Sequence, residues 1–360
     1  MPSMSEEQKE VLPETDITLH HSSQEEGQSE ILFTGNPKFD EKYGHIFQEI
    51  ATGGEKKIYG AEKGSRKKRN IILKKDKESR DSPHSFSESE AQEHFRSERE
   101  RYTLHRNPEY FGEHVVPTRI SILPTTSARD IQQYILLRCQ LAVPEILLEN
   151  GEFFPLCTGY LRKEDRSPVG KTETYIDRSS ICEAIVALKN VENKENIDIR
   201  KCIFNIRRDE TINRELSYFI KKTEEDSAFK KAVEDFVQKA IRYANETGEI
   251  VDILGGGRSG NVMFMKRKEE WTYRMIDIDM KLPTQHPSYI SLHAAREALD
   301  RLEKDPATRL SWEEKSHMIN GFNFVLGINA MAAALGIKDR VHLLKNVDFE
   351  KILTHLEIRI

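Results

Sequence analysis

The residues best suited to chemistry lie in and after the stretch VDILGGGRSGNVMF. It carries Asp252, three consecutive glycines, Arg258, Gly260 and Asn261, and two further carboxylates, Asp277 and Asp279, follow in MIDID. Carboxylate and amide oxygens are the ligands that Mg²⁺ prefers, and the ion often keeps phosphate oxygens as further ligands. Carboxylates held close together repel one another unless a cation neutralises them. The residue types therefore predict a site for Mg²⁺ and phosphate, with Asn261, Asp277 and Asp279 as metal ligands.

A β-hairpin is the element that must bring these residues together. The apolar runs VMFM and WTYRMI are joined by the short charged turn KRKEE. Strands rise about 3.3 Å per residue, so arms of similar length return Asp277 close to Asn261. Asp252 approaches from the other end of the glycine loop. Taken singly, Asp252 and Asn261 could be turn or helix-cap residues, but their ordered combination favours the metal site.

A long amphipathic helix precedes this segment, and the C-terminal part of the chain is mainly helical. The run SAFKKAVEDFVQKAIRYANETG repeats apolar residues at helical spacing, and Gly248 stands where a helix would stop. We expect a helical lobe over residues 143–360, with the loop and hairpin at residues 249–280. The expected apolar face of the helix consists of Phe229, Val233, Phe236, Val237, Ala240 and Ala244.

The N-terminal part predicts a small sheet. Residues 1–40 are rich in Glu, Ser and Gln, so we expect a disordered tail there. The short apolar runs HIFQEIA, KIYGAE and NIILKK, with turns between them, are typical of an antiparallel meander. A charged helix, EAQEHFRSERERYTLHR, and two further strands, HVVPTRISIL and QQYILLRCQLAV, follow. We expect residues 41–142 to form a small α+β lobe of five strands and one helix.

Length and composition narrow the function classes. The chain has 360 residues, enough for two modest domains or one two-lobed domain. A net charge of -5 gives no strong nucleic-acid signal. The four cysteines show no C-x-x-C spacing and are expected to be reduced thiols of a cytoplasmic protein. The longest run of small apolar residues, NAMAAALGI, falls short of the roughly 20 residues that span a bilayer, so no membrane partner is expected.

The order of these motifs resembles the protein-kinase-like superfamily, in particular its atypical small-molecule branch, the aminoglycoside and choline kinases. VDILGGGRSGN resembles the loop H-G-D-x-x-x-x-N, and MIDID resembles the metal-binding segment after the hairpin. In the N-terminal half, IATGGEKKIYGAE resembles the glycine-loop hairpin, IILK the strand V-A-I-K, and FRSERE the helix whose Glu pairs with that Lys. The resemblance implies a two-lobed kinase-like fold, with an antiparallel-sheet N-lobe and a larger, mainly helical C-lobe.

The resemblance also implies two cofactors, ATP and Mg²⁺, and roles for single residues. Ile72 would contact adenine, and Lys74 would bind the α- and β-phosphates while paired with Glu98, with Glu100 as the alternative to Glu98. Asp252 would be the catalytic base that accepts the proton of an acceptor hydroxyl on a small molecule or protein. Arg258 would act on the transferring phosphate or face solvent. The residues assigned to ATP binding are Gly53, Gly54, Ile72, Lys74 and Glu98.

Two other functions stay open. Asn261 lies nine positions after Asp252, against five in D-x-x-x-x-N, and Ile250 and Val251 stand where the family has H-G. These differences favour a pseudokinase, a nucleotide- or partner-binding protein without turnover. A nucleotidyltransferase would use the carboxylates of DIDM, but it would leave the N-terminal meander unexplained. Lys74 could also be the polar end of an edge strand, with Lys75 as the alternative phosphate contact.

Overall fold

Two compact units make up the chain. The computed structural model describes residues 19–21, 31–34, 46–52, 56–61, 71–76, 86–126, 132–141, 151–153, 210–251, 261–267, 270–276, 292–305, 308–342, 347–348 and 351–352. Unit 1 comprises Met1–Glu100 and Val116–Leu148, and unit 2 comprises Arg101–Val115 and Glu149–Ile360. Helices and antiparallel sheets together confirm the α+β class. Within the described ranges, none of the helices has both the length and the apolar character needed to cross a membrane.

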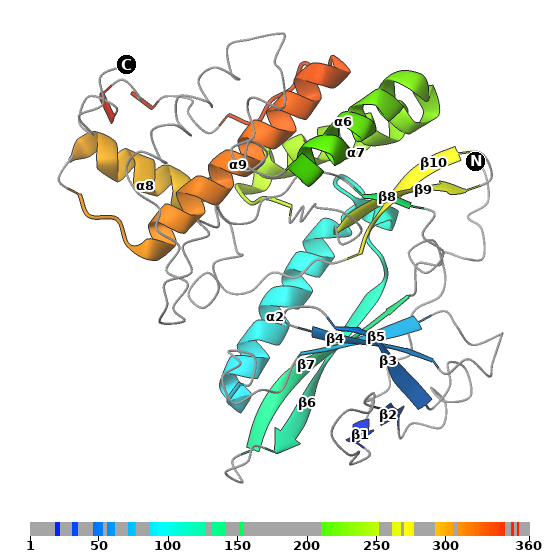
Figure 1. The fold of residues 1–360 in the computed structure, drawn as a ribbon. Helices are drawn as coiled ribbons and strands as arrows, with labels where there is room; N and C mark the ends of the chain where they lie inside the picture. Colours follow the sequence, from blue (N-terminus) through cyan, green and yellow to red (C-terminus); the bar gives the residue numbers. More distant parts are fainter. Residues whose placement is uncertain are drawn as a thin grey trace. The chain divides into compact units, whose positions relative to one another are not determined.

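Unit 1 is built on a seven-stranded antiparallel sheet with the order β1-β2-β3-β4-β5-β7-β6. Helix α2 (Glu88–His105) follows the third strand of the predicted meander, as expected, and lies beside the sheet (Figure 1). The strands are β1 (Leu19–His21), β2 (Ile31–Thr34), β3 (Ile46–Thr52), β4 (Lys56–Ala61), β5 (Ile71–Asp76), β6 (Thr118–Thr126) and β7 (Gln132–Leu141).

The two faces of this sheet differ in chemistry because side chains alternate along each strand. One face carries the core of unit 1. The other face carries Lys74 and, directly opposite it on β7, Arg138. Glu98 of α2 bonds to Arg138, so the helix packs on this second face. The core residues of the first face are Phe47, Tyr59, Ile71, Leu73, Leu123, Ile135, Leu137 and Cys139.

Two strands lie within the segment that the sequence predicted to be a disordered tail. β1 pairs with β2, and β2 pairs with β3, so both extend the sheet at the edge of the meander. The run Ile31–Phe33 is apolar and suited to a strand, although the polar composition of residues 1–40 as a whole hides it. The prediction of a disordered tail is therefore wrong for β1 and β2, and the remainder of residues 1–40 lies outside the described residues.

Unit 2 is mainly helical, as predicted, and also carries a three-stranded antiparallel sheet with the order β10-β9-β8. Helices α6 and α7 lie side by side, and α8 packs against α9 (Figure 1). The sequence did not predict β8, because its three residues are too few to form a pattern. The elements are a 3₁₀ turn, η2 (Gly112–His114), β8 (Gly151–Phe153), α6 (Glu210–Glu225), α7 (Ser227–Thr247), β9 (Val262–Arg267), β10 (Glu270–Met275), α8 (Leu292–Lys304) and α9 (Trp312–Leu335).

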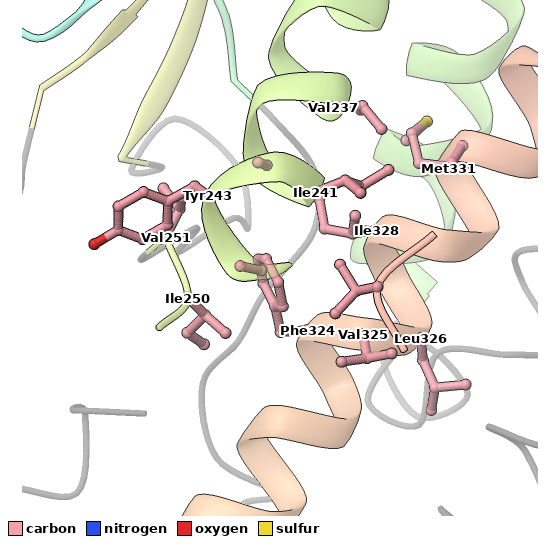
Figure 2. Packing of buried hydrophobic residues seen from close by; sticks show 14 of the residues in the cluster. Val237, Ile241, Tyr243, Ile250, Val251, Phe324, Val325, Leu326, Ile328 and Met331 are labelled. Atoms are coloured by element: carbon pink, nitrogen blue, oxygen red, sulfur yellow. The ribbon is translucent and has the colours of Figure 1, made fainter. Parts of the chain in front are cut away.

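Helix α7 is the centre of the unit 2 core. All six residues of its predicted apolar face are buried. Figure 2 shows Val237 and Ile241 of α7 close to Ile328 and Met331 of α9. The helix begins after Asp226, whose carboxylate accepts hydrogen bonds from the backbone N–H groups of residues 228 and 229. Such an N-cap satisfies backbone donors that have no partner within the helix.

The boundary between the units differs from the predicted one at residue 142. Residues 101–115 belong to unit 2 although the sequence assigned them to the N-terminal lobe. The reason is aromatic packing. The ring of Phe111 lies 6.2 Å from that of Phe236 and 5.7 Å from that of Tyr243, both on α7. A segment with so large an apolar side chain in the helical core folds with that core.

The last residue of α2, His105, is buried in unit 2 beside the ring of Tyr243. Its Nδ1 lies 2.8 Å from the carbonyl oxygen of Arg101, to which it can donate. Its Nε2 has no hydrogen-bond partner in the described part of the chain. Burial disfavours the charged ring and lowers the pKa of His105 from 6.5 to about 4.

We expect His105 to destabilise the fold at acid pH. Between its folded pKa of about 4 and its unfolded value near 6.5, only the unfolded chain binds the proton, so stability falls as the pH drops through this window. The full shift corresponds to roughly 3 kcal/mol. Denaturant unfolding should show that the free energy of unfolding falls more between pH 7 and pH 4 in the wild type than in His105→Gln, whose side chain cannot titrate there. Equal losses in the two proteins would contradict the assignment.

Candidate functional site

Two buried cations face one another in unit 1. Lys74 on β5 and Arg138 on β7 are cross-strand partners, so their Cβ atoms lie on one face, about 4.5–5.5 Å apart. The two residues are only 7% and 5% exposed. Like charges opposite each other destabilise a sheet, and removing each from water costs several kcal/mol more. This part of the fold therefore requires an anion.

Glu98 of α2 supplies one anion. Nε of Arg138 donates to Oε1 of Glu98 at 2.5 Å, and Nη2 donates to Oε2 at 2.8 Å. Two parallel hydrogen bonds between a guanidinium and a carboxylate combine charge with a fixed geometry, so they are stronger than neutral hydrogen bonds. Glu98 is itself 7% exposed, which makes this a buried ion pair. Removing one partner from such a pair typically costs about 3–5 kcal/mol.

Arg138 is a site residue that sequence reasoning missed. The signal for it was a single charge in an otherwise apolar part of the strand, YILLRCQL. The sequence predicted Lys74 as the partner of Glu98; that pairing stays a prediction, while the bonds to Arg138 are observed. Glu98 is buried and its alternative, Glu100, is exposed. The burial of Glu98 therefore agrees with the choice of Glu98 over Glu100.

An apolar surface lies on the same face of the sheet, beside the charges. On β4, Ile58 and Gly60 are the cross-strand partners of Lys74 and Ile72. Ile50 lies where the register of β3 and β4 shifts, and it is 51% exposed. A Cβ on Gly60 would come within 3.3 Å of Cδ1 of Ile50. The glycine thus allows Ile50 to lie close against the strand, next to Ile72.

In unit 2 the hairpin closes at Asn261. The register of β9 and β10 ends with Val262 opposite Met275. The backbone N–H of Ile276 then donates to the carbonyl oxygen of Asn261 at 2.9 Å. Asn261 is 8% exposed. The predicted hairpin is thus confirmed, and its described end brings Ile276 to Asn261, whereas the position of Asp277, the next residue, stays a prediction.

Two carboxylates of α7 hold the second strand of the hairpin. Nε1 of Trp271 donates to Asp226 at 2.7 Å, and the hydroxyl of Tyr273 donates to Asp235 at 3.1 Å. The hydrogen bond from the backbone N–H of Phe229 is the main cause of a lowered pKa of Asp226, to which the Trp271 hydrogen bond adds. Asp226 thus remains an acceptor at neutral pH. The hairpin is fixed to α7 at both of these aromatic residues.

The chain that leads to Asp252 is fixed by α7 and the core. The hydroxyl of Tyr243 donates to Glu249 at 3.0 Å, a contact that sequence reasoning did not predict. Ile250 and Val251 are buried in the cluster shown in Figure 2. The backbone is therefore positioned up to the residue before Asp252.

Several predicted site residues lie outside the described residues, so their positions remain predictions. Among the residues that the structure does describe, no three His, Cys, Asp or Glu side chains gather closely enough to hold a metal ion. The chemistry of the predicted metal site therefore rests on Asn261 and on the two aspartates that follow the hairpin. The residues outside the described ranges are Gly53, Gly54, Asp252, Arg258, Asp277 and Asp279.

Comparison of the chain with models of protein families, with curated proteins and with solved structures found no match.

Gly248 sets the turn from α7 into the segment that precedes Asp252. Its φ is 67°, in the left-handed region, and its carbonyl oxygen accepts a hydrogen bond from Leu292 N–H at 2.9 Å. A Cβ at this position would overlap the ring of His293. The left-handed backbone conformation therefore favours glycine here, and a Cβ would in addition require the exposed side chain of His293 to move.

We expect Gly248→Ala to reduce the free energy of unfolding more than Gly336→Ala does. Gly336 ends α9 with a similar φ of 76° but has open space where a Cβ would lie, so its substitution carries only the conformational cost of roughly 1–2 kcal/mol. The additional loss in Gly248→Ala should largely disappear when His293 is also changed to Ala. Denaturant unfolding of Gly248→Ala, Gly336→Ala, His293→Ala and the double variant of Gly248 and His293 measures this. An equal loss at both glycines, unaffected by His293→Ala, would show that the ring does not restrict the turn.

Proposed function

We propose that the protein is an ATP- and Mg²⁺-dependent phosphotransferase of the kinase-like fold, which transfers the γ-phosphate to a hydroxyl group on a small molecule or protein. One observation carries this proposal. The buried cations Lys74 and Arg138 stand beside the apolar surface of Ile50, Ile58 and Ile72 on one face of one sheet. Apolar contacts for a base next to fixed cations for phosphates are the arrangement that a nucleotide requires.

The roles in unit 1 follow from this arrangement. Ile72 would contact adenine, and Lys74 would bind the α- and β-phosphates. Glu98, which the helix brings onto this face, would keep the positive groups in place. The position of α2 after the third strand of the meander supports the resemblance to the kinase-like N-lobe.

The roles in unit 2 concern the metal and the acceptor. Asn261 and Asp277 would hold Mg²⁺, with Asp279 as a further oxygen ligand, and the metal would neutralise phosphate charge as it develops. Asp252 would accept the proton of the acceptor hydroxyl, and Arg258 would contact the transferring phosphate. Phosphoryl transfer requires mainly positioning and charge neutralisation from a protein, and oxygen ligands for a metal ion would serve both.

A pseudokinase is the second candidate. The observation that favours it is the burial of Ile250 and Val251. These two apolar residues stand where the family has H-G, and their side chains belong to the core of unit 2. A protein of this kind would bind the nucleotide through the same residues and release it unchanged.

The nucleotide assignment predicts different effects of two neighbouring lysines. Lys74→Met should weaken MgATP binding about tenfold to a hundredfold, because it removes a charge-assisted contact to phosphate, and should leave adenosine binding unchanged. Lys75→Met is the matched control, because Lys75 is also buried but lies on the opposite face of β5. Calorimetric titration with MgATP and adenosine measures both. Equal weakening of the two ligands, or a larger effect of Lys75→Met, would contradict the assignment.

Turnover separates the enzyme from the pseudokinase. In the enzyme, Asp252→Ala should keep the affinity for MgATP and reduce phosphate transfer by about 10²- to 10⁴-fold, the usual contribution of a general base. Asp339→Ala, at an exposed position after α9, is the control. The measurement is transfer of labelled γ-phosphate across a broad panel of hydroxyl acceptors. Tight MgATP binding by the wild type without transfer to any acceptor would favour the pseudokinase.

A further inference from the structure

The short segment that follows α2 lies along one edge of β10 in unit 2, and β9 pairs with the other edge. The hydrogen bond from Ile276 to Asn261 sets the alternation of the hairpin, so the backbone groups of residues 273 and 275 point away from β9. Residues 113–115 meet them there, so the end of β10 is held from both sides. The three contacts are a hydrogen bond from Nδ1 of His114 to the carbonyl oxygen of Tyr273 (3.1 Å), one from Nη1 of Arg274 to the carbonyl oxygen of Glu113 (2.8 Å) and a parallel bridge between Val115 and Met275.

His114 joins this edge of β10 to the core of unit 2. Its ring stacks on the ring of Tyr273, with the centroids 3.9 Å apart and an angle of 11° between the planes. The Tyr273 hydroxyl donates to Oδ2 of Asp235 on α7, and Nε2 of His114 lies 3.7 Å from the same oxygen. Lys239 also donates to that oxygen, at 2.8 Å. One side chain therefore contacts the backbone of β10, an aromatic ring of the strand and a carboxylate of α7.

We propose that His114 is a positioning residue of the predicted metal site: by fixing the end of β10, it holds Asn261 in place. This inference rests on the proposed function, because it takes Asn261 as a ligand of Mg²⁺. The backbone links the two residues. Ile276 follows the bridge at Met275 and donates its N–H to the carbonyl oxygen of Asn261 at 2.9 Å. A ligand that is already held in place need not be ordered when the metal binds, which raises the affinity for the metal.

The hydrogen bond and the stacking of His114 can be separated by substitution. A carbonyl oxygen only accepts, so Nδ1 carries the proton and donates to Tyr273. Burial is the main cause of a lowered pKa of His114, and the Lys239 ammonium adds to it, so the ring is neutral at pH 7 and has no proton on Nε2 for Asp235. Asn places an amide N–H near the position of Nδ1, whereas Phe keeps a ring against Tyr273 but has no donor.

The dissociation constant of ATP without Mg²⁺, divided by that with Mg²⁺, measures the contribution of the metal. His114→Phe should reduce this ratio about two- to tenfold, the range that one net hydrogen bond contributes, and should leave the affinity for metal-free ATP unchanged. His114→Asn should keep the ratio close to that of the wild type. The matched control is His105→Phe, since His105 is a histidine of unit 2 that stacks on Phe111 rather than on the hairpin; its ratio should equal the wild-type ratio. Calorimetric titration of each protein with ATP gives these values.

Other roles of His114 give other results. If His114 only stabilises the fold, His114→Phe lowers the denaturant midpoint and leaves the ratio at the wild-type value, and the proposal is overturned. If His114→Asn reduces the ratio as much as His114→Phe does, the hydrogen bond to Tyr273 does not position the site, which also overturns it. Should His114→Phe fail to fold, His114→Asn is compared with His114→Gln, whose amide lies nearer to the position of Nε2. We then expect the higher ratio for His114→Asn, and equal ratios would overturn the proposal.

Hydrogen exchange of the Ile276 amide, measured without nucleotide, separates this inference from the proposed function. This amide should exchange about two- to tenfold faster in His114→Phe than in the wild type, because the end of β10 opens more easily. Amides of α9 serve as the reference for global unfolding. If the wild type binds no ATP or shows no effect of Mg²⁺ while Ile276 exchanges faster in the variant, the proposed function fails and the positioning of Asn261 stands. If ATP binding depends on Mg²⁺ but neither the ratio nor the exchange changes in His114→Phe, the positioning role fails alone.

Discussion

Burial of a charged pair between α2 and the sheet constrains how unit 1 can fold. Each ion gives up several kcal/mol of hydration, which is recovered only when the partner is in place with good geometry. The strand register fixes Arg138, and the 3.6-residue period of α2 turns Glu98 toward it. Any shift of the helix along the sheet would separate the two groups. The position of α2, and with it the surroundings of Lys74, therefore depends on this pair.

Unit 2 positions its candidate residues by a different means. Before Asp252, Glu249 forms an ion pair with Arg101 in which Nε and Oε2 lie 3.9 Å apart, farther than in the bonds of Arg138 to Glu98. The hairpin and this turn are also held by hydrogen bonds from aromatic side chains to carboxylates and by packing on α7. Neutral donors cost less to bury than charges, so unit 2 can fix several segments around one helix. Both units therefore hold their candidate residues on helices and strands. Unit 1 does so mainly through a buried ion pair, and unit 2 mainly through hydrogen bonds and apolar packing.

Local patterns in the sequence predicted the helices and strands well. They did not predict which side chains bond to one another across the fold. The face of α7, the meander and the β9–β10 hairpin each follow from a period within one run of residues. Arg138 was missed because its role depends on which helix residue reaches it across the sheet, and that is decided by register and tertiary packing. β1 and β2 were missed because the composition of forty residues hid the short run Ile31–Phe33. The boundary was misplaced because Phe111 joins a core far from it in sequence.

In the proposed phosphotransferase, the segment that leads into the glycine loop would position the catalytic base. Apolar packing of Ile250 and Val251 fixes the backbone before Asp252, where the kinase-like loop motif has His and Gly. Such packing holds a chain in position but gives no hydrogen bond that would orient the carboxylate itself. With four glycines between Asp252 and Asn261, a bound acceptor would then have to provide the remaining order, because glycine imposes few limits on the backbone. In the proposed phosphotransferase, binding energy from the acceptor would position the base, so hydrolysis of ATP by water would be slow and transfer would depend on the acceptor.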